Sequence, residues 1–175
     1  MLAKIITNLI FIIGLAALQA GFISGLPGAA SGLNLALVVL IFILGFGSFG
    51  FALAWAAGLG WLLETFSFLP FGVLLSGLCL TIIISNLLLN YFFTNRSLYS
   101  FLALTGLATV VYKLIISLLV LIFSVENLFL PAGEFWLAMF SQLGLNMLAS
   151  LFIFYFLHFL GKNFKPVFLM KNKKY

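Results

Sequence analysis

The sequence predicts an all-α membrane protein: one compact bundle of about six transmembrane helices with both termini in the cytoplasm. Of its 175 residues, 65% are hydrophobic and only 6% are charged, whereas a soluble domain carries about 25% charged residues. The apolar runs do not alternate with polar residues, as the strands of a membrane β-barrel would. A helix needs ~20 apolar residues to cross a bilayer, so a chain of this length accommodates about six helices with short loops.

Polar and glycine-rich segments separate the predicted helices. The first apolar run follows Lys4, and a loop punctuated by Pro27 and Gly28 ends it. The next run, residues 33–68, would be ~54 Å long as one helix, which exceeds a ~30 Å bilayer core. We therefore expect the chain to turn back near Gly47. The predicted spans are 4–23, 33–47, 49–68, 71–93, 98–123 and 135–160, and a basic tail follows over 161–175.

The basic residues predict the orientation of these helices. With a cytoplasmic N-terminus, the inner ends carry Lys4, Arg96 and the tail lysines, whereas the outer loops near residues 27, 67 and 126 carry no lysine or arginine. Cytoplasmic loops are enriched in these residues, so one orientation accounts for every loop charge.

The triplet Leu18-Gln19-Ala20 resembles a signal-peptidase site, but the apolar run before it is long for a signal core, so we expect the first span to be retained. The tail is also expected to contact anionic lipid through Lys162, Lys165, Lys171, Lys173 and Lys174.

Several kinds of functional site are not expected. Cys79 is the only cysteine, which excludes an internal disulfide and a metal-binding cysteine pair. The sequence has no aspartate, and His158 has no acid or cysteine nearby. With no nucleophile-and-base set, phosphate-binding loop or metal cluster, we expect neither an enzyme nor a cofactor or metal site. The net charge of +5 does not indicate nucleic-acid binding, because the lysines cluster at the chain ends.

Polar side chains inside the predicted spans are candidate functional residues, because each is costly in hydrocarbon. Lys113 is the only basic residue well inside a span, so it either faces the protein interior, which the polar stripe on its helix favours, or snorkels to the interface. For the amides, interhelical hydrogen bonds are the expected role, and a small-ligand site lined by amides is the alternative. The candidates recur at four-residue spacing: Thr105, Thr109 and Lys113 on the fifth span, Asn86 and Asn90 on the fourth, and Gln142 and Asn146 on the sixth.

The third predicted span carries a candidate contact face for another helix. Gly50, Ala54 and Gly58 recur every four residues, and small side chains let another backbone approach closely in lipid. Glu64 lies at the end of the same span. Such an acid either reaches interfacial water or contacts another helix or a partner's transmembrane segment. Both Glu64 and Lys113 lie in the outer half, so pairing between them is a further hypothesis.

Short motifs along the chain indicate a family. Leu18-Gln19 closes the first span, and Leu33-Asn34-Leu35 opens the second with leucine where the family often has proline. The glycine-bearing span from Gly50 to Glu64 precedes Pro70-Phe71-Gly72, and Glu64 stands where the family usually has an aspartate. Asn95-Arg96-Ser97 follows the fourth span, like the family's short inner loop. On these motifs the chain resembles the rod shape-determining protein MreD family.

The resemblance implies a scaffold of the bacterial cell-elongation machinery in the cytoplasmic (inner) membrane. Its partners would be an MreC-like protein, the elongation cell-wall synthases that make peptidoglycan and, indirectly, an actin-like cytoskeleton, with membrane lipids around it. Under this reading Glu64 and the face of Gly50, Ala54 and Gly58 contact a partner helix.

An alternative is the substrate-binding membrane subunit of an energy-coupling-factor vitamin transporter. Such subunits also have about six helices and a similar size. Ala16 and Ala20 would then dock the coupling subunit, and a ligand pocket would be lined by Lys113, Asn86 and Gln142.

Overall fold

The computed structural model describes residues 2–92, 97–123 and 132–163, and every regular element in these ranges is a helix. This confirms the all-α membrane bundle that the sequence predicts. Four stretches of the described chain are long and apolar enough to cross a membrane: Ala3–Ile23, Val73–Tyr91, Leu98–Ile122 and Gly133–Phe159. The elements are α1 (Leu2–Ala17), the π-helical η1 (Leu18–Ile23), the 3-10 helix η2 (Gly28–Gly32), α2 (Leu35–Phe46), α3 (Phe49–Glu64), α4 (Val73–Tyr91), α5 (Leu98–Ile122) and α6 (Ala132–Asn163).

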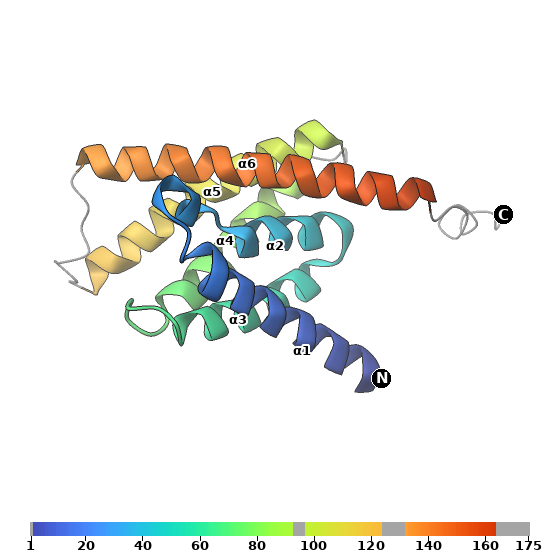
Figure 1. Cartoon of the computed structure of the whole chain (residues 1–175), viewed down its shortest axis with the longest axis horizontal. Coiled ribbons are helices and arrows are strands. Elements are labelled where there is room, and N and C mark those ends of the chain that lie inside the picture. Colours follow the sequence, from blue (N-terminus) through green and yellow to red (C-terminus); the bar gives the residue numbers. More distant parts are fainter. Residues whose placement is uncertain (1, 93–96, 124–131, 164–175) are drawn as a thin grey trace.

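The helices run back and forth between two ends of the molecule (Figure 1). The start of α1, the α2–α3 turn, the end of α4 and the end of α6 lie toward the right of the view. The η1–η2 connection, the α3–α4 turn, the end of α5 and the start of α6 lie toward the left. We call the first group the N-terminal end and the second the η2 end. This alternation is the arrangement that successive antiparallel membrane helices produce.

Helix α2 forms the centre of the bundle. It packs against α3, α4, α5 and α6, and Leu37, Leu40 and Ile41 are completely buried. Its sequence, LALVVLIFILGF, is apolar all round, and such a helix belongs in an interior. Phe42 extends this core by stacking on Phe101 of α5, with ring centroids 4.8 Å apart.

The chain turns between α2 and α3 at Gly47, where the sequence predicts the bend. The Gly47 N–H donates to the Ile43 carbonyl oxygen at 2.8 Å, and the Ser48 side chain caps α3 by accepting from the Phe51 N–H. A Cβ at residue 47 would lie 2.7 Å from the Ile43 oxygen, so only glycine fits this turn. Helices of 12 and 16 residues are about 18 and 24 Å long, shorter than a ~30 Å bilayer core. Six complete spans therefore stay a prediction.

Helix α1 is the least embedded of the helices. It packs mainly against α3, and among the α1 side chains that the structure describes only Ile12 and Ala16 are buried. Large apolar side chains cover the surface of α1 that faces away from the bundle, and Ile10 and Phe11 are each 63% exposed. Figure 1 shows α1 at the edge of the bundle opposite α6. One side of α1 and the adjoining surface of α3 are thus open to lipid or to another helix.

Candidate functional site

Glu64 closes α3 and caps the start of α4. Its side chain is only 5% exposed, and Oε1 accepts a hydrogen bond from the Leu75 N–H at 3.1 Å. Leu75 lies in the first turn of α4, whose N–H groups have no acceptor within the helix, and a carboxylate is favoured beside the positive end of a helix. The sequence leaves interfacial water, another helix and a partner's segment open as contacts of Glu64. The structure shows the second of these, a contact with a helix of its own chain, and Glu64 is absent from the exposed face of α3.

Replacing Glu64 by leucine is expected to lower the free energy of unfolding by about 1 kcal/mol, because the Leu75 N–H loses its acceptor. Glutamine keeps a side-chain oxygen, so Glu64→Gln should retain most of the stability. Unfolding in detergent micelles measures both variants. Equal losses in the two would contradict the capping role.

A chain of hydrogen bonds joins α2, α5 and α6. Asn146 of α6 is fully buried; its Oδ1 accepts from the Asn34 N–H at 2.9 Å, and its Nδ2 donates to Thr109 Oγ1 at 2.9 Å. Thr109 donates to the Thr105 carbonyl at 2.8 Å, and Thr105 donates to Ser150 Oγ at 3.3 Å. The structure thus brings together the two threonines of the α5 stripe and the second amide of α6, and adds Asn34 and Ser150.

Two amides that the sequence analysis does not assign to a site hold the start of α2. Asn34 Oδ1 accepts from the Leu37 N–H at 3.0 Å and so caps the helix. Gln19 Oε1 accepts from the Leu35 N–H at 2.9 Å, while Gln19 Nε2 donates to the Leu33 carbonyl at 2.9 Å. The sequence signal for these two residues is that one amide lies on each side of the first predicted loop, within otherwise apolar sequence.

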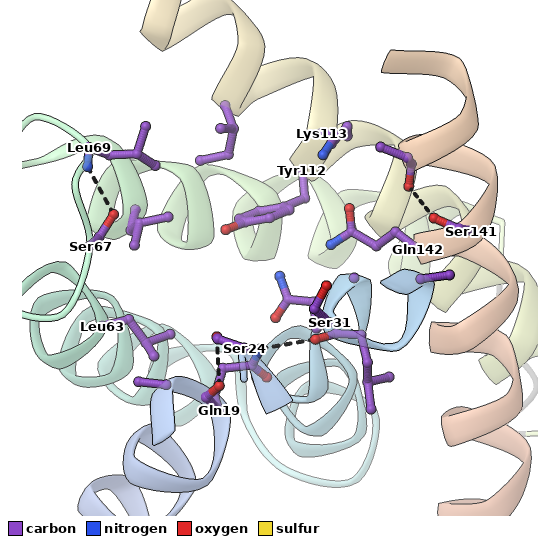
Figure 2. A pocket seen from close by; sticks show the side chains of 18 of the residues that line it. Gln19, Ser24, Ser31, Leu63, Ser67, Leu69, Tyr112, Lys113, Ser141 and Gln142 are labelled. Atoms are coloured by element: carbon purple, nitrogen blue, oxygen red, sulfur yellow. Dashed lines mark hydrogen bonds between the residues drawn. The ribbon is translucent and has the colours of Figure 1, made fainter. Parts of the chain in front are cut away.

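A cavity of about 1120 Å³ opens beside this network (Figure 2). Segments that gather at the η2 end line it: η1, η2, the α3–α4 turn, α5 and the first part of α6. Leu63, Leu74 and Ile116 contribute apolar wall. The polar side chains along it are Gln19, Ser24, Ser31, Asn34, Ser67, Tyr112, Lys113, Glu134, Ser141 and Gln142. A wall of mixed character can bind a ligand that has both polar and apolar parts.

Lys113 belongs to this cavity and not to an ion pair with Glu64. Its side chain is half-buried, and its amine points toward the hollow in Figure 2. Neither Glu64 carboxylate oxygen accepts from Lys113: Oε1 accepts from the Leu75 N–H, and Oε2 has no hydrogen-bond partner within the described residues. The hypothesis that Glu64 and Lys113 pair is therefore wrong for this fold.

Gln142 faces the same cavity from α6. It is only 8% exposed and points toward Tyr112 in Figure 2. No hydrogen bond joins its amide to another group in the part of the chain that the structure describes. A buried amide without a protein partner leaves a donor and an acceptor for a ligand or water. Lys113 and Gln142 therefore supply the cavity with a cation and a free amide.

The predicted small-residue face of α3 is only partly covered by the bundle. Gly50 and Ala54 are exposed, and a Cβ built on Gly50 meets nothing within 4 Å. Gly58, one turn beyond Ala54, packs against Ile12 of α1, whose Cδ1 would lie 3.4 Å from an added Cβ. The exposed face of α3, which we define by Gly50 and Ala54, remains accessible.

A second set of small residues on α3 packs inside the molecule. Ala52, Ala56 and Gly60 share the same four-residue spacing and are all buried. A Cβ on Gly60 would lie 2.6 Å from Leu75 Cα, so the backbones of α3 and α4 touch there. The internal helix contact is thus two residues away from the face that the sequence singles out.

The remaining sequence candidates lie apart from the cavity. Asn86 is half-buried and Asn90 exposed on α4, and neither lines the cavity. Cys79 is half-buried on α4, and His158 is exposed near the end of α6. Lys162 belongs to the last turn of α6. The other tail lysines lie outside the described residues: Lys165, Lys171, Lys173 and Lys174.

The geometry supports two candidate sites, the exposed face of α3 and the cavity at the η2 end. Comparisons with protein-family models, with curated proteins and with solved structures find no match for this chain. The assignment of a function to either site therefore depends on the residues and contacts of the chain itself.

Proposed function

We propose that this chain is an integral membrane scaffold of the bacterial cell-elongation machinery. In this role it lies in the cytoplasmic (inner) membrane and links peptidoglycan synthesis to the cell-shape cytoskeleton through helix–helix contacts. Its partners are an MreC-like protein and the elongation cell-wall synthases, and through them an actin-like cytoskeleton. The resemblance of its short motifs to the MreD family supports this role.

The observation that carries the proposal is the exposed face of α3 next to the loosely packed α1. Gly50 and Ala54 lie two turns and one turn before Gly58, where α1 contacts α3. Small residues let helix backbones approach closely in lipid, where there is no hydrophobic drive for helices to associate. A transmembrane helix of a partner would fit against Gly50 and Ala54, with α1 as its neighbour.

The orientation that we propose places the N-terminal end of the bundle in the cytoplasm. The start of α1 and the end of α6 lie at that same end (Figure 1). The exposed Lys4 marks it within α1, and the basic tail follows α6 in the sequence. Cytoplasmic flanks are enriched in lysine and arginine, so these charges favour this orientation. The η2 end and its cavity would then face the periplasmic side.

Substituting Ala54 by phenylalanine is expected to reduce partner recovery by about tenfold or more, because the larger ring keeps a partner helix from approaching. The measurement is mass spectrometry of proteins that co-purify with the N-terminally tagged chain from gently solubilised bacterial membranes. Ala103→Phe is the matched control, since Ala103 is an exposed alanine on α5. Equal recovery of elongation proteins with both variants would contradict the contact face.

A second candidate function is the substrate-binding subunit of an energy-coupling-factor vitamin transporter, and the cavity is the observation that favours it. The same experiment separates the two candidates. Recovery of a paired ATPase module with a coupling membrane subunit, in place of elongation proteins, would overturn the scaffold proposal.

A further inference from the structure

The cavity at the η2 end carries one cation and one acid among its described lining residues, and they occupy different positions. Lys113 is half-buried on α5, midway along its helix. Glu134 is exposed in the first turn of α6. Both line the cavity. A ligand complementary to both residues has a negative group at the half-buried lysine and a positive group at the exposed acid.

Hydrogen-bonding groups accompany the lysine. Gln142 is more than nine-tenths buried, has no partner among the described residues, and points into the cavity (Figure 2). Ser141, one residue before it, also lines the cavity, although its hydroxyl donates to the Ala138 carbonyl at 3.0 Å. An amide donor beside an ammonium group suits an anion with several oxygens, because charge-assisted hydrogen bonds are about twice as strong as neutral ones.

The edge of the cavity is strongly apolar and faces outward. Phe66, Phe68 and Leu137 line the cavity and are 67%, 101% and 75% exposed. In a chain embedded in a bilayer, such side chains contact acyl chains. The ligand therefore has a polar group that enters the cavity and an apolar part that can stay in the membrane.

From this arrangement we propose that the cavity binds the head group of a zwitterionic phospholipid, such as phosphatidylethanolamine. The phosphate lies at Lys113 and Gln142, and the ammonium group lies toward Glu134. The cavity volume of about 1120 Å³ accommodates a head group with the first part of its acyl chains. This binding site is independent of the scaffold role, because the exposed face of α3 does not line the cavity.

Lipid add-back to the detergent-stripped chain, followed by native mass spectrometry, tests the proposal. Wild type is expected to bind one phosphatidylethanolamine more tightly than phosphatidylglycerol. Lys113→Gln should weaken phosphatidylethanolamine binding by about tenfold, the size of a lost charge-assisted hydrogen bond. Gln142→Leu should weaken it less, since a neutral donor is lost. Glu134→Gln should remove the preference over phosphatidylglycerol.

Lys4→Gln is the matched control, because Lys4 is an exposed lysine on α1 and does not line the cavity. Unfolding curves establish that each variant is folded. Free phosphoethanolamine probes the other source of the same head group, and we expect it to bind far more weakly than the lipid. Three results would overturn the proposal: equal lipid binding by Lys113→Gln and Lys4→Gln, a wild-type preference for phosphatidylglycerol, or binding of free phosphoethanolamine as tight as that of the lipid.

Discussion

Gly60→Ala is expected to destabilise the folded bundle by about 1–3 kcal/mol, although it adds a single methyl group. The added Cβ would lie 2.6 Å from Leu75 Cα, a distance at which two carbon atoms repel strongly. Its neighbour is backbone, so no side chain can rotate away, and α3 and α4 would have to separate. Since α3 packs more extensively against α4 than against any other element, that movement weakens much of the core. Chemical unfolding in detergent micelles measures the loss.

Gly58→Ala provides the matched control for this prediction, in the same helix and two residues earlier. There the nearest atom to an added Cβ is the end of the Ile12 side chain at 3.4 Å, which is ordinary contact with a flexible group. Alanine also favours the helix over glycine, so Gly58→Ala should leave the free energy of unfolding nearly unchanged. Equal stability of the two variants would mean that α3 and α4 do not approach as closely as described.

This pair of variants also shows why only part of the helix packing was predictable from the sequence. Ala52, Ala56 and Gly60 have the same spacing as Gly50, Ala54 and Gly58, and both sets suit close helix contact. The spacing places each set on one face but does not tell which face meets the bundle. That choice depends on where α4 returns after the α3–α4 turn, which is a tertiary property.

The bend at Gly47 was predictable because it follows from the length of the apolar run over residues 33–68. An unbroken apolar run longer than the bilayer core has to turn, and a glycine within the run allows a tight turn.

The candidate site was less predictable from the sequence. The polar spacing on α5 and α6 indicated that Thr109 and Asn146 would need partners, but Asn34 lies 112 residues before Asn146. No local pattern records a contact at that separation.

Glu64 illustrates the same limit for a charged residue. An acid at the end of an apolar span indicates a specific contact, and the structure shows one, with the Leu75 N–H. Its burial and its partner depend on the α3–α4 turn bringing the start of α4 back to the end of α3. The sequence alone left an exposed partner contact equally open.

Asn146→Leu is the second substitution with a large expected effect, a loss of about 1–3 kcal/mol in the free energy of unfolding. Leucine cannot accept from the Asn34 N–H or donate to Thr109 Oγ1, two bonds of 2.9 Å each. The Asn34 N–H would then be a buried donor without a partner, which is more costly than the loss of an average hydrogen bond. Asn90→Leu is the control, because Asn90 is exposed on α4 and should tolerate the change.

A double-mutant cycle with Thr109→Val separates this bond from general repacking. Because Asn146 donates to Thr109, the two substitutions remove one shared interaction, and their effects should fall short of additivity by about 0.5 kcal/mol or more. Full additivity would contradict the hydrogen bond between Asn146 and Thr109.

Asn146 also lies one turn beyond Gln142 on α6, so the loss of its side chain should loosen the cavity wall and lower stability and lipid binding together. Lys113→Gln, by contrast, should lower lipid binding alone, and this difference distinguishes a residue that holds the cavity from one that binds the ligand.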